Sequence, residues 1–433
     1  MKHARSRKIH VMTMGCPKNI VDSEKLMAQL RQNGAELVPT LEGAEIAVIN
    51  TCGFIDPAKE ESIDALLSTA RLKSGGTLKK VYALGCLSER YGNELALEMP
   101  EIDGFFGSGR PEELLRTLGM QHRDELLGER CLTTPSHYAY LKISEGCDNP
   151  CSFCAIPLMR GKHVSRPLED ILLEARRLSA TGVKELIVIG QDTTYYGVDR
   201  YGKRRLAELL TRLGEIEGLH WIRLMYAYPA KFPLDVLDVL ANNPRMCKYI
   251  DIPIQHVSDG VLRSMRRGIS SRSLRDLLDT IRERVPGVAL RTTLIVGYPG
   301  EGREEFEELL EFVRVSKFER LGVFPYSQEE GTHAFPLGDP IPPVEKERRQ
   351  SLVMELQREI SENRNAGLIH TRHRVVIDRE ENDLFVGRTE YDAPEIDNEV
   401  FVRAGEGLGP GTFCDVDIVE AYEYDVVGEC VFP

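Results

Sequence analysis

The sequence predicts a multidomain α/β protein. It divides into a parallel-sheet domain at residues 8–119, a linker at 120–137, a partial, TIM-like (βα)6 barrel at 138–368 and a small antiparallel, OB-like β-barrel at 369–433. Apolar runs alternate with helix-like segments up to residue 368, which is typical of parallel sheets. The central repeats are about thirty to forty residues long, as in βα barrels. Short alternating strands follow the last long helix and indicate a separate all-β domain.

In the first domain, three apolar runs each end at a cysteine. These runs span residues 10–16, 46–52 and 81–86, and helix-like segments follow at 22–33, 57–72 and 87–97. The carboxyl ends of parallel strands meet at one sheet edge, where ligands bind. We therefore expect Cys16, Cys52 and Cys86 to converge. A single free cysteine is most often a buried structural residue, but the repeated placement at strand exits favours a metal cluster held by three thiolates.

The central domain contains six predicted strands, with polar or glycine residues where they end. The strands are expected at 138–143, 185–189, 221–226, 249–254, 289–296 and 320–324, and helices at 168–180, 233–241, 273–284 and 304–316. In βα barrels the reactive groups lie at the carboxyl ends of the strands. Gln191, Asp192, Gln255, His256 and Gly297 occupy such exits. The Gly297 stretch is also explained by a turn, Gln191 and Asp192 by a cap on the following segment, and His256 by a loop histidine with satisfied hydrogen bonds. Only the shared location therefore favours a functional role.

A cysteine-rich loop follows the first strand of the central domain. Cys147, Cys151 and Cys154 are separated by gaps of three and two residues, and Cys131 and Cys247 are far away in sequence. Structural zinc sites and four-cysteine clusters need four protein ligands. Three thiolates would leave one iron of a cubane cluster open to an exchangeable ligand. S-adenosylmethionine offers an amine and a carboxylate for that iron, and a reduced cluster at a potential as low as about −700 mV could cleave its sulfonium to a 5′-deoxyadenosyl radical.

Composition limits the cellular environment and the classes of partner. No segment approaches the apolar run of about 20 residues that a membrane span needs, and residues 1–14 lack a signal-peptide pattern. Ten cysteines without a secretion signal favour the reducing cytoplasm. Of the net charge of −13, residues 366–433 carry −11, from sixteen Asp and Glu against five Arg. Such a tail repels phosphate backbones and attracts a basic protein, or it is simply a solvated acidic face.

The tail is predicted to begin after a long charged helix at residues 344–366. Short alternating strands follow at 374–377, 384–389, 399–402, 414–421 and 425–430. Five such strands suggest a small barrel of the OB type. We expect Cys414 and Cys430 to be core residues and assign no role to Cys131.

Two sets of motifs carry a resemblance to a known family. Cys147-x-x-x-Cys151-x-x-Cys154, with Phe153 before the last cysteine, resembles the signature of the radical S-adenosylmethionine enzymes. Gly15-Cys16-Pro-Lys18-Asn, the positions of Cys52 and Cys86, and a C-terminal domain resembling TRAM are similar to the methylthiotransferases among them. The Cys-Pro-Lys-Asn form and Gly190-Gln-Asp-Thr-Thr194 are similar to the branch that modifies a ribosomal protein.

The resemblance implies cofactors and site residues. Two 4Fe–4S clusters are implied: Cys147, Cys151 and Cys154 would hold the radical-generating one, and Cys16, Cys52 and Cys86 an auxiliary one that delivers sulfur. S-adenosyl-L-methionine is the second cofactor, and Phe153, Gln191 and Gly297 are its expected contacts. Beyond the cluster ligands, no catalytic residue is assigned.

The resemblance also implies a substrate and partners. The implied reaction is methylthiolation of the β-carbon of an aspartate in the twelfth protein of the small ribosomal subunit, a basic protein that the acidic TRAM-like domain would engage. A low-potential electron donor such as flavodoxin would supply the electron. A transfer-RNA adenosine methylthiotransferase and a non-catalytic iron-sulfur scaffold for ribosome assembly are the alternatives.

Overall fold

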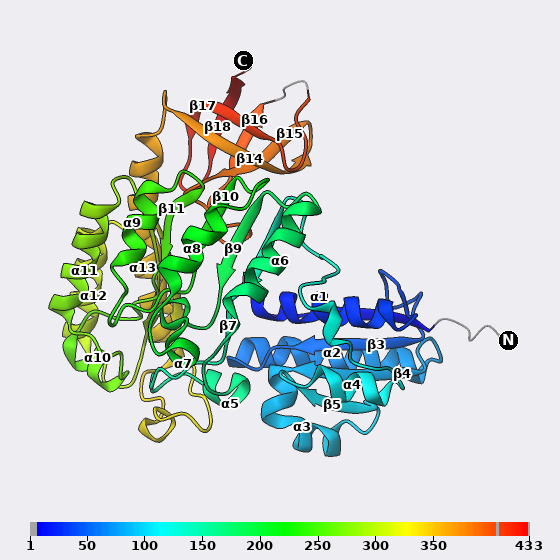
Figure 1. The fold of residues 1–433 in the computed structure, drawn as a ribbon. Coiled ribbons are helices and arrows are strands. Elements are labelled where there is room, and N and C mark those ends of the chain that lie inside the picture. The colour runs from blue at the N-terminus through cyan, green and yellow to red at the C-terminus, as the bar shows by residue number, and fades with distance from the viewer. Residues whose placement is uncertain (1–6, 404–406, 432–433) are drawn as a thin grey trace.

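A computed structural model describes residues 7–403 and 407–431 of the chain. Figure 1 shows three parts: the N-terminal domain in blue and cyan, the central domain mainly in green and yellow, and the C-terminal barrel in orange and red. The central domain lies between the other two. In the described part of the chain, no helix is both long and apolar enough to cross a membrane.

The N-terminal domain is a five-stranded, wholly parallel sheet in the order β2-β1-β3-β4-β5. The three predicted cysteine-ending strands are its three central strands. The two-residue β2 and the Gly-Phe-Phe-Gly strand β5 were not predicted, because neither is long enough to show a pattern. Its strands are β1 (Lys8–Thr13), β2 (Glu36–Leu37), β3 (Ile46–Thr51), β4 (Lys80–Gly85) and β5 (Gly104–Gly107), and its helices are α1 (Pro17–Gln32), α2 (Asp56–Ser74), α3 (Cys86–Glu98) and α4 (Pro111–Thr117).

The central domain is an open sheet of six parallel strands, each beside its neighbour in sequence: β6-β9-β10-β11-β12-β13. All six predicted strands are present. They are β6 (Tyr138–Lys142), β9 (Glu185–Ile189), β10 (Trp221–Leu224), β11 (Met246–Asp251), β12 (Ala289–Val296) and β13 (Arg320–Pro325). This sequential order, with β6 and β13 at the two edges, is that of a barrel that has not closed.

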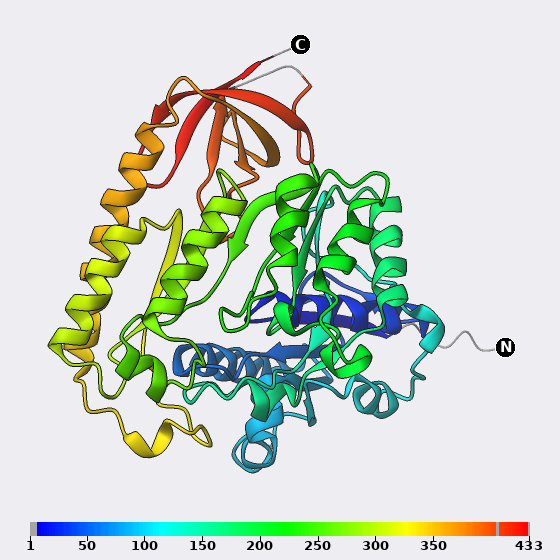
Figure 2. The ribbon, with the colours of Figure 1, turned by 60° about the vertical axis from the view of Figure 1, so that its left-hand side comes forward.

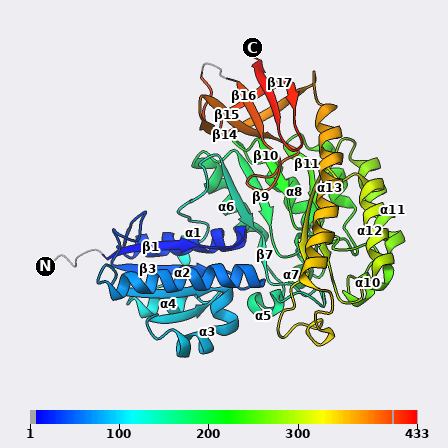
Figure 3. The same ribbon diagram turned by 180° about the vertical axis from the view of Figure 1, so that it is seen from behind.

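Helices cover the outer side of this sheet (Figure 2). They are α6 (Leu168–Ala180), α8 (Leu206–Gly214), α9 (Asp235–Asn242), α11 (Ser271–Arg284), α12 (Arg303–Ser316) and α13 (Pro343–Ala366). The short helices α5 (Ile156–Arg160), α7 (Val198–Tyr201) and α10 (Asp259–Ser264) lie in the connecting loops, and α5 packs against α3 of the N-terminal domain. The four predicted helices correspond to α6, α9, α11 and α12. The long α13 runs beside β13 and leads into the C-terminal barrel (Figure 3).

Successive side chains along each strand point to opposite faces of the sheet, so the central domain has an outer and an inner hydrophobic core. In β6, Ala139 and Leu141 join the large cluster beneath the helices, whereas Tyr138 and Tyr140 face the inside of the partial barrel. The inner cluster also contains Val21 of α1 and Val376 of the tail. The open interior is thus filled from both neighbouring domains, which fixes their positions relative to the sheet.

The C-terminal domain is a closed five-stranded barrel in the order β14-β15-β16-β18-β17. Four of its five pairings are antiparallel as predicted, but β16 and β18 run parallel. A closed ring with an odd number of strands cannot alternate throughout, so one parallel pair is unavoidable. The strands are β14 (Arg372–Glu381), β15 (Leu384–Thr389), β16 (Val400–Arg403), β17 (Phe413–Ala421) and β18 (Val426–Val431).

The C-terminal barrel sits against the amino ends of the central strands. Asp392 pairs with Arg320 at 2.7 Å, and Asp397 accepts from Tyr249 at 2.7 Å. His220 stacks on Phe413 with ring centroids 4.9 Å apart. Part of the acidic charge of the tail is therefore neutralised inside the molecule.

Candidate functional site

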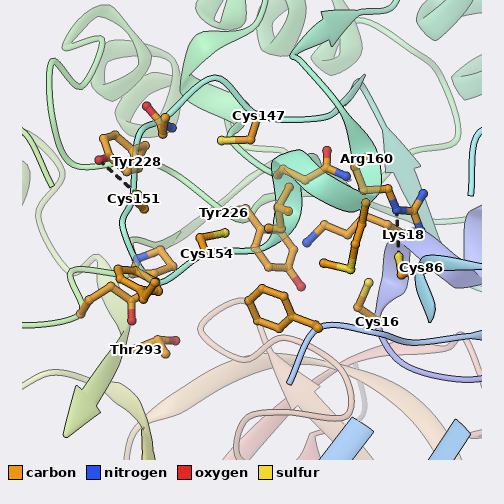
Figure 4. A pocket seen from close by; sticks show the side chains of 18 of the residues that line it. Cys16, Lys18, Cys86, Cys147, Cys151, Cys154, Arg160, Tyr226, Tyr228 and Thr293 are labelled. Atoms are coloured by element: carbon orange, nitrogen blue, oxygen red, sulfur yellow. Dashed lines mark hydrogen bonds between the residues drawn. The ribbon is translucent and has the colours of Figure 1, made fainter. Parts of the chain in front are cut away.

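Six of the ten cysteines line one cavity of about 330 Å³ between the N-terminal and central domains (Figure 4). One wall carries Cys16, Cys52 and Cys86, and the other carries Cys147, Cys151 and Cys154. The cavity lies at the carboxyl ends of the central strands, because Gln191, Tyr226 and Gln255 from the exits of β9, β10 and β11 also line it. Figure 1 shows the C-terminal barrel at the end of the molecule opposite α5 and the cysteine loop.

Glycines allow the first set of cysteines to approach one another. Gly15 has φ +86°, and a Cβ there would lie 2.8 Å from the Cβ of Cys52. Gly85 has φ +104°, and its Cβ would lie 2.4 Å from Oδ1 of Asn50. Both values are below ordinary contact distances, and both φ angles favour glycine. The glycines that precede Cys16 and Cys86 therefore allow the ends of the three strands to pack closely together.

The second set of cysteines lies in a loop that is clamped at its base. The short strands β7 (Ser144–Glu145) and β8 (Val164–Ser165) pair antiparallel on either side of it. Within the loop, Ser152 donates to the carbonyl of Ser264 at 2.8 Å, and its N–H donates to the carbonyl of Met265 at 3.0 Å. The loop is thus held at both ends and in the middle.

One arginine reaches a thiol of each set. Arg160 donates through Nε to Sγ of Cys86 at 3.2 Å, and Arg267 donates through Nη1 to Sγ of Cys151 at 3.1 Å. Arg160 also pairs with Asp22 at 2.6 Å and with Glu145 at 3.3 Å. Each guanidinium stabilises negative charge on the sulfur that it contacts.

Burial opposes ionisation of the thiols by themselves. It raises the pKa of Cys86 to about 12, of Cys154 to about 12 and of Cys147 to about 11. It also raises the pKa of Cys52. Thiolates at these positions need a strong positive charge beside them, which a metal cluster supplies.

Unpartnered polar atoms face the same cavity. Oε1 of Gln191, Oε1 of Gln255 and Nε of Arg267 are buried and form no hydrogen bond with any residue between 7 and 403 or 407 and 431. Buried polar atoms without partners are costly, so they indicate a polar ligand. Aromatic residues such as Phe153 and Tyr228 supply apolar surface beside them. This combination fits S-adenosylmethionine, which has a polar amino-acid end and an adenine ring.

The predicted cofactor contacts are only partly brought together. Phe153 and Gln191 line the cavity, whereas Gly297 is not among its lining residues. The N–H of Gly297 instead donates to Glu301 at 3.0 Å. The three contacts stay predictions. Arg160 and Arg267 were not predicted, since neither lies in a recognisable sequence motif.

The spacing of the thiols bears on the kind of metal site. In the described part of the chain, no three His, Cys, Asp or Glu side chains lie close enough to hold a single metal ion. A cubane cluster binds each thiolate to a different iron, so its ligands stand further apart. Among residues 7–403 and 407–431, the thiols therefore form no mononuclear zinc site.

Lys18 also reaches this cavity from the first turn of α1. Its ammonium lies 2.9 Å from the centroid of the Tyr226 ring, and only 7% of the residue is exposed. Burial lowers the pKa of Lys18 to about 8. In Figure 4, Lys18 and Arg160 lie on the side of Cys16 and Cys86. Lys18 belongs to the Gly15-Cys16-Pro-Lys18-Asn motif, but no role was predicted for it.

The three parts of the chain match three known protein families. Residues 141–313 match the Radical SAM superfamily, residues 8–107 the uncharacterized protein family UPF0004, and residues 369–431 the TRAM domain. The fold and these matches define a radical SAM enzyme, a class that uses a 4Fe–4S cluster and S-adenosylmethionine. That class fits a cavity with a clamped three-cysteine loop on one wall.

Relatives over the full length identify the family. The chain is 52% identical to the ribosomal protein uS12 methylthiotransferase RimO of Cytophaga hutchinsonii, over 99% of each chain. It is 52% identical to the protein of the same name from Flavobacterium johnsoniae, over 99% of each chain, and 51% identical to that from Chloroherpeton thalassium, over 98% of each chain. The chain belongs to the RimO family of radical SAM methylthiotransferases.

Solved structures support the fold. The chain resembles the radical S-adenosylmethionine methyltransferase TsrM of Kitasatospora setae, with a TM-score of 0.55 and 14% identity over 76% of this chain and 77% of that one. The radical enzyme OxsB gives a TM-score of 0.53 with 12% identity, over 82% of this chain and 57% of that one. At such low identity the likeness concerns the fold alone.

Proposed function

We propose that this protein methylthiolates the β-carbon of an aspartate in ribosomal protein uS12. The observation that carries the proposal is the placement of two three-cysteine sets on opposite walls of one cavity. A radical generator alone needs only the set in the loop. The second set gives the same cavity a place for a sulfur source. Relatives named for this reaction align along the whole chain.

The proposed ligands follow from these walls. Cys147, Cys151 and Cys154 would hold the radical-generating 4Fe–4S cluster, and Cys16, Cys52 and Cys86 would hold an auxiliary 4Fe–4S cluster. When bound, these groups supply a 5′-deoxyadenosyl radical from S-adenosylmethionine and a transferable sulfur. Two molecules of S-adenosylmethionine per product are proposed, one for the methyl group and one for the radical.

The chain itself would provide positioning and charge. Gln191, Gln255 and Arg267 offer unpartnered polar atoms to the amino-acid end of S-adenosylmethionine. The contacts of Arg160 and Arg267 with Cys86 and Cys151 would stabilise thiolate charge on each wall. Enclosure between two domains limits the access of water, which would protect a reactive radical.

The acidic C-terminal barrel supports a basic protein partner over RNA. Glu390, Asp392, Glu395 and Asp397 contact the central domain, and Asp378 contacts His137 of the linker, so these acids are unavailable. Exposed acids remain on the outer strands and hairpins, among them Glu380, Glu381, Asp383, Asp415 and Glu429. This surface is at the far end of the molecule from the cavity. It would bind a region of the ribosomal protein, or of the surrounding subunit, that lies far from the modified aspartate.

The reaction would take place in the cytoplasm, where ribosomal proteins assemble. A low-potential donor such as flavodoxin would supply the electron. Transfer-RNA modification is the second candidate, since a small barrel of this type commonly binds nucleic acid. The charge of −11 over residues 366–433 disfavours it.

Mass spectrometry tests the proposal. Anaerobically reconstituted protein is incubated with S-adenosylmethionine and a reductant, with either purified uS12 or bulk transfer RNA. We expect uS12 to gain the mass of one methylthio group at an aspartate, and the RNA to stay unchanged. Modified RNA with unmodified protein would contradict the proposal. Failure to form any 5′-deoxyadenosine would favour a non-catalytic assembly scaffold.

A further inference from the structure

The lining of the cavity has an uneven charge. Its basic residues are Lys18, Arg160 and Arg267, and the lining contains no Asp or Glu. Arg160 is bound by Asp22, Glu145 and a thiol, and Arg267 by the carbonyl of Pro253 and a thiol. Lys18 differs from both, because within the described residues its ammonium forms no hydrogen bond and no ion pair. Its ammonium lies over the π face of Tyr226 instead.

The nearest carboxylates are already engaged elsewhere. Asp251 accepts from Nη1 of Arg291 at 3.0 Å and from the N–H of Tyr226 at 3.0 Å. Glu145 accepts from Lys142 at 2.6 Å and from Gln191 at 2.6 Å. The largest attraction on the Lys18 ammonium comes from Cys16, and Asp251 and Glu145 add weaker attraction, but none of the three forms a hydrogen bond or an ion pair with it. A buried ammonium without a partner is costly unless a ligand supplies an anion.

The backbone around Lys18 shows that this position is built. Tyr226, whose ring receives the ammonium, has φ +59°, an unfavourable value for a residue with a bulky side chain. Pro17 opens α1 beside Cys16, and Asn19 donates to the carbonyls of Met14 at 2.8 Å and of Thr51 at 3.1 Å. Lys18 is thus held on the wall of the Cys16, Cys52 and Cys86 set, facing the cavity.

We propose that Lys18 is a specificity-determining residue that binds the carboxylate of the substrate aspartate. This rests on the proposed function, in which the modified residue carries a carboxylate one bond from the carbon that receives sulfur. An ammonium beside the auxiliary set would hold that carboxylate and so turn the β-carbon toward the sulfur. The same contact would reject an asparagine or a nucleobase, which bring no negative charge to a buried cation.

The test is a double-mutant cycle on binding. Reconstituted wild-type enzyme, Lys18→Met and Lys18→Arg are each titrated anaerobically, in the presence of S-adenosylhomocysteine, with uS12 or with uS12 whose target aspartate is replaced by asparagine. We expect the wild type to prefer the aspartate form by roughly tenfold or more, as for a hydrogen bond between charged groups. Lys18→Met should bring the ratio of the two Kd values close to one, and Lys18→Arg should keep much of the preference.

Iron and sulfide content, measured for every variant, separates a structural role from recognition. The proposal is supported if Lys18→Met retains the iron and sulfide of two clusters but no longer prefers the aspartate form of uS12. An unchanged preference in Lys18→Met, or loss of one cluster's iron from it, would overturn the proposal. If wild-type enzyme leaves uS12 unmodified, the proposed function itself fails. If it modifies uS12 but binds both forms equally, only the role of Lys18 fails.

Discussion

At the scale of single residues, the two sets of cysteines differ in how they are supported. The loop cysteines are close in sequence, so a local clamp of two short strands and Ser152 suffices to place them. Cys16, Cys52 and Cys86 come from three strand exits and depend on the integrity of the sheet. The two sets should therefore respond separately to substitution.

Replacing one ligand from each set tests this separation. Cys151→Ala should abolish the formation of 5′-deoxyadenosine, because the proposed radical-generating site loses one of its three ligands. Cys52→Ala should leave this cleavage intact and stop sulfur insertion, because only the auxiliary site is damaged. Chromatographic assay of 5′-deoxyadenosine and mass analysis of uS12 measure the two effects.

Cys131→Ala is the matched control, because Cys131 lies outside the cavity lining. It should retain both activities. Retained methylthio product in Cys52→Ala would show that the N-terminal domain is not the source of sulfur. Continued cleavage in Cys151→Ala would refute the assignment of the loop.

At the scale of elements, the turn from β4 into α3 places Cys86. Gly85 is the last residue of β4, and Cys86 is the first residue of α3. A side chain at Gly85 would overlap Asn50 and come within 2.6 Å of the carbonyl oxygen of Thr51, both at the end of β3. The neighbouring strand exits cannot both stay in place if this glycine is replaced.

Gly85→Ala should lower the free energy of unfolding by more than the roughly 1–3 kcal/mol that an unfavourable φ costs, because overlap with β3 adds to it. It should also reduce the iron bound at the auxiliary site. Urea unfolding and iron analysis measure both. Gly76→Ala is the control, because Gly76 has φ +82° but nothing within 4 Å of its Cβ position. Equal effects of the two variants would show that overlap is unimportant.

At the scale of the whole molecule, buried ion pairs connect the N-terminal domain, the linker and the central domain. Arg130 of the linker donates to Glu24 of α1 at 2.9 Å and to Glu174 of α6 at 3.2 Å. Arg166 donates to Glu174 at 2.6 Å, and Lys25 of α1 lies 3.6 Å from it. Glu24, Arg130 and Glu174 have fully buried side chains. These pairs join the two domains whose facing walls form the cavity.

Glu174 should make stability depend on acid pH. Although burial opposes it, the charges of Lys25, Arg166 and Arg130 lower the pKa of Glu174 from 4.5 to about 2. A carboxyl whose pKa is depressed in the folded state stabilises that state above pH 4.5, and the contribution is lost as the pH falls towards 2. Stability of the metal-free chain should fall by roughly 2 kcal/mol between pH 5 and 3 through this group.

Glu174→Gln removes the titrating group. Its free energy of unfolding should be lower than that of wild type at pH 6 and should decrease less between pH 6 and pH 3. Urea unfolding at several pH values provides the measurement. Glu169→Gln, at an exposed position of the same helix, is the control and should follow wild type. A parallel pH dependence in Glu174→Gln and wild type would mean that other groups govern acid unfolding.

Much of the fold followed from local patterns. Apolar runs and their spacing predicted the six central strands, the three cysteine-ending strands and the five tail strands. Buried strand positions need apolar side chains, so each buried strand leaves a local pattern in the sequence. The loop of Cys147, Cys151 and Cys154 was recognisable because its residues are contiguous. The short strands β2 and β5 were missed because two to four residues carry no period.

The sequence by itself determined the three-part architecture, both sets of cysteines and the chemical class. Only the tertiary structure decided that both sets face one cavity, that Arg160 and Arg267 each donate to a thiol of one set, and that the ammonium of Lys18 lies over the Tyr226 ring there. It also showed that part of the acidic tail is neutralised against the central domain. Patterns along a chain report which residues are buried. They do not report which charged side chains meet across a domain boundary, because those contacts depend on how the folded domains pack.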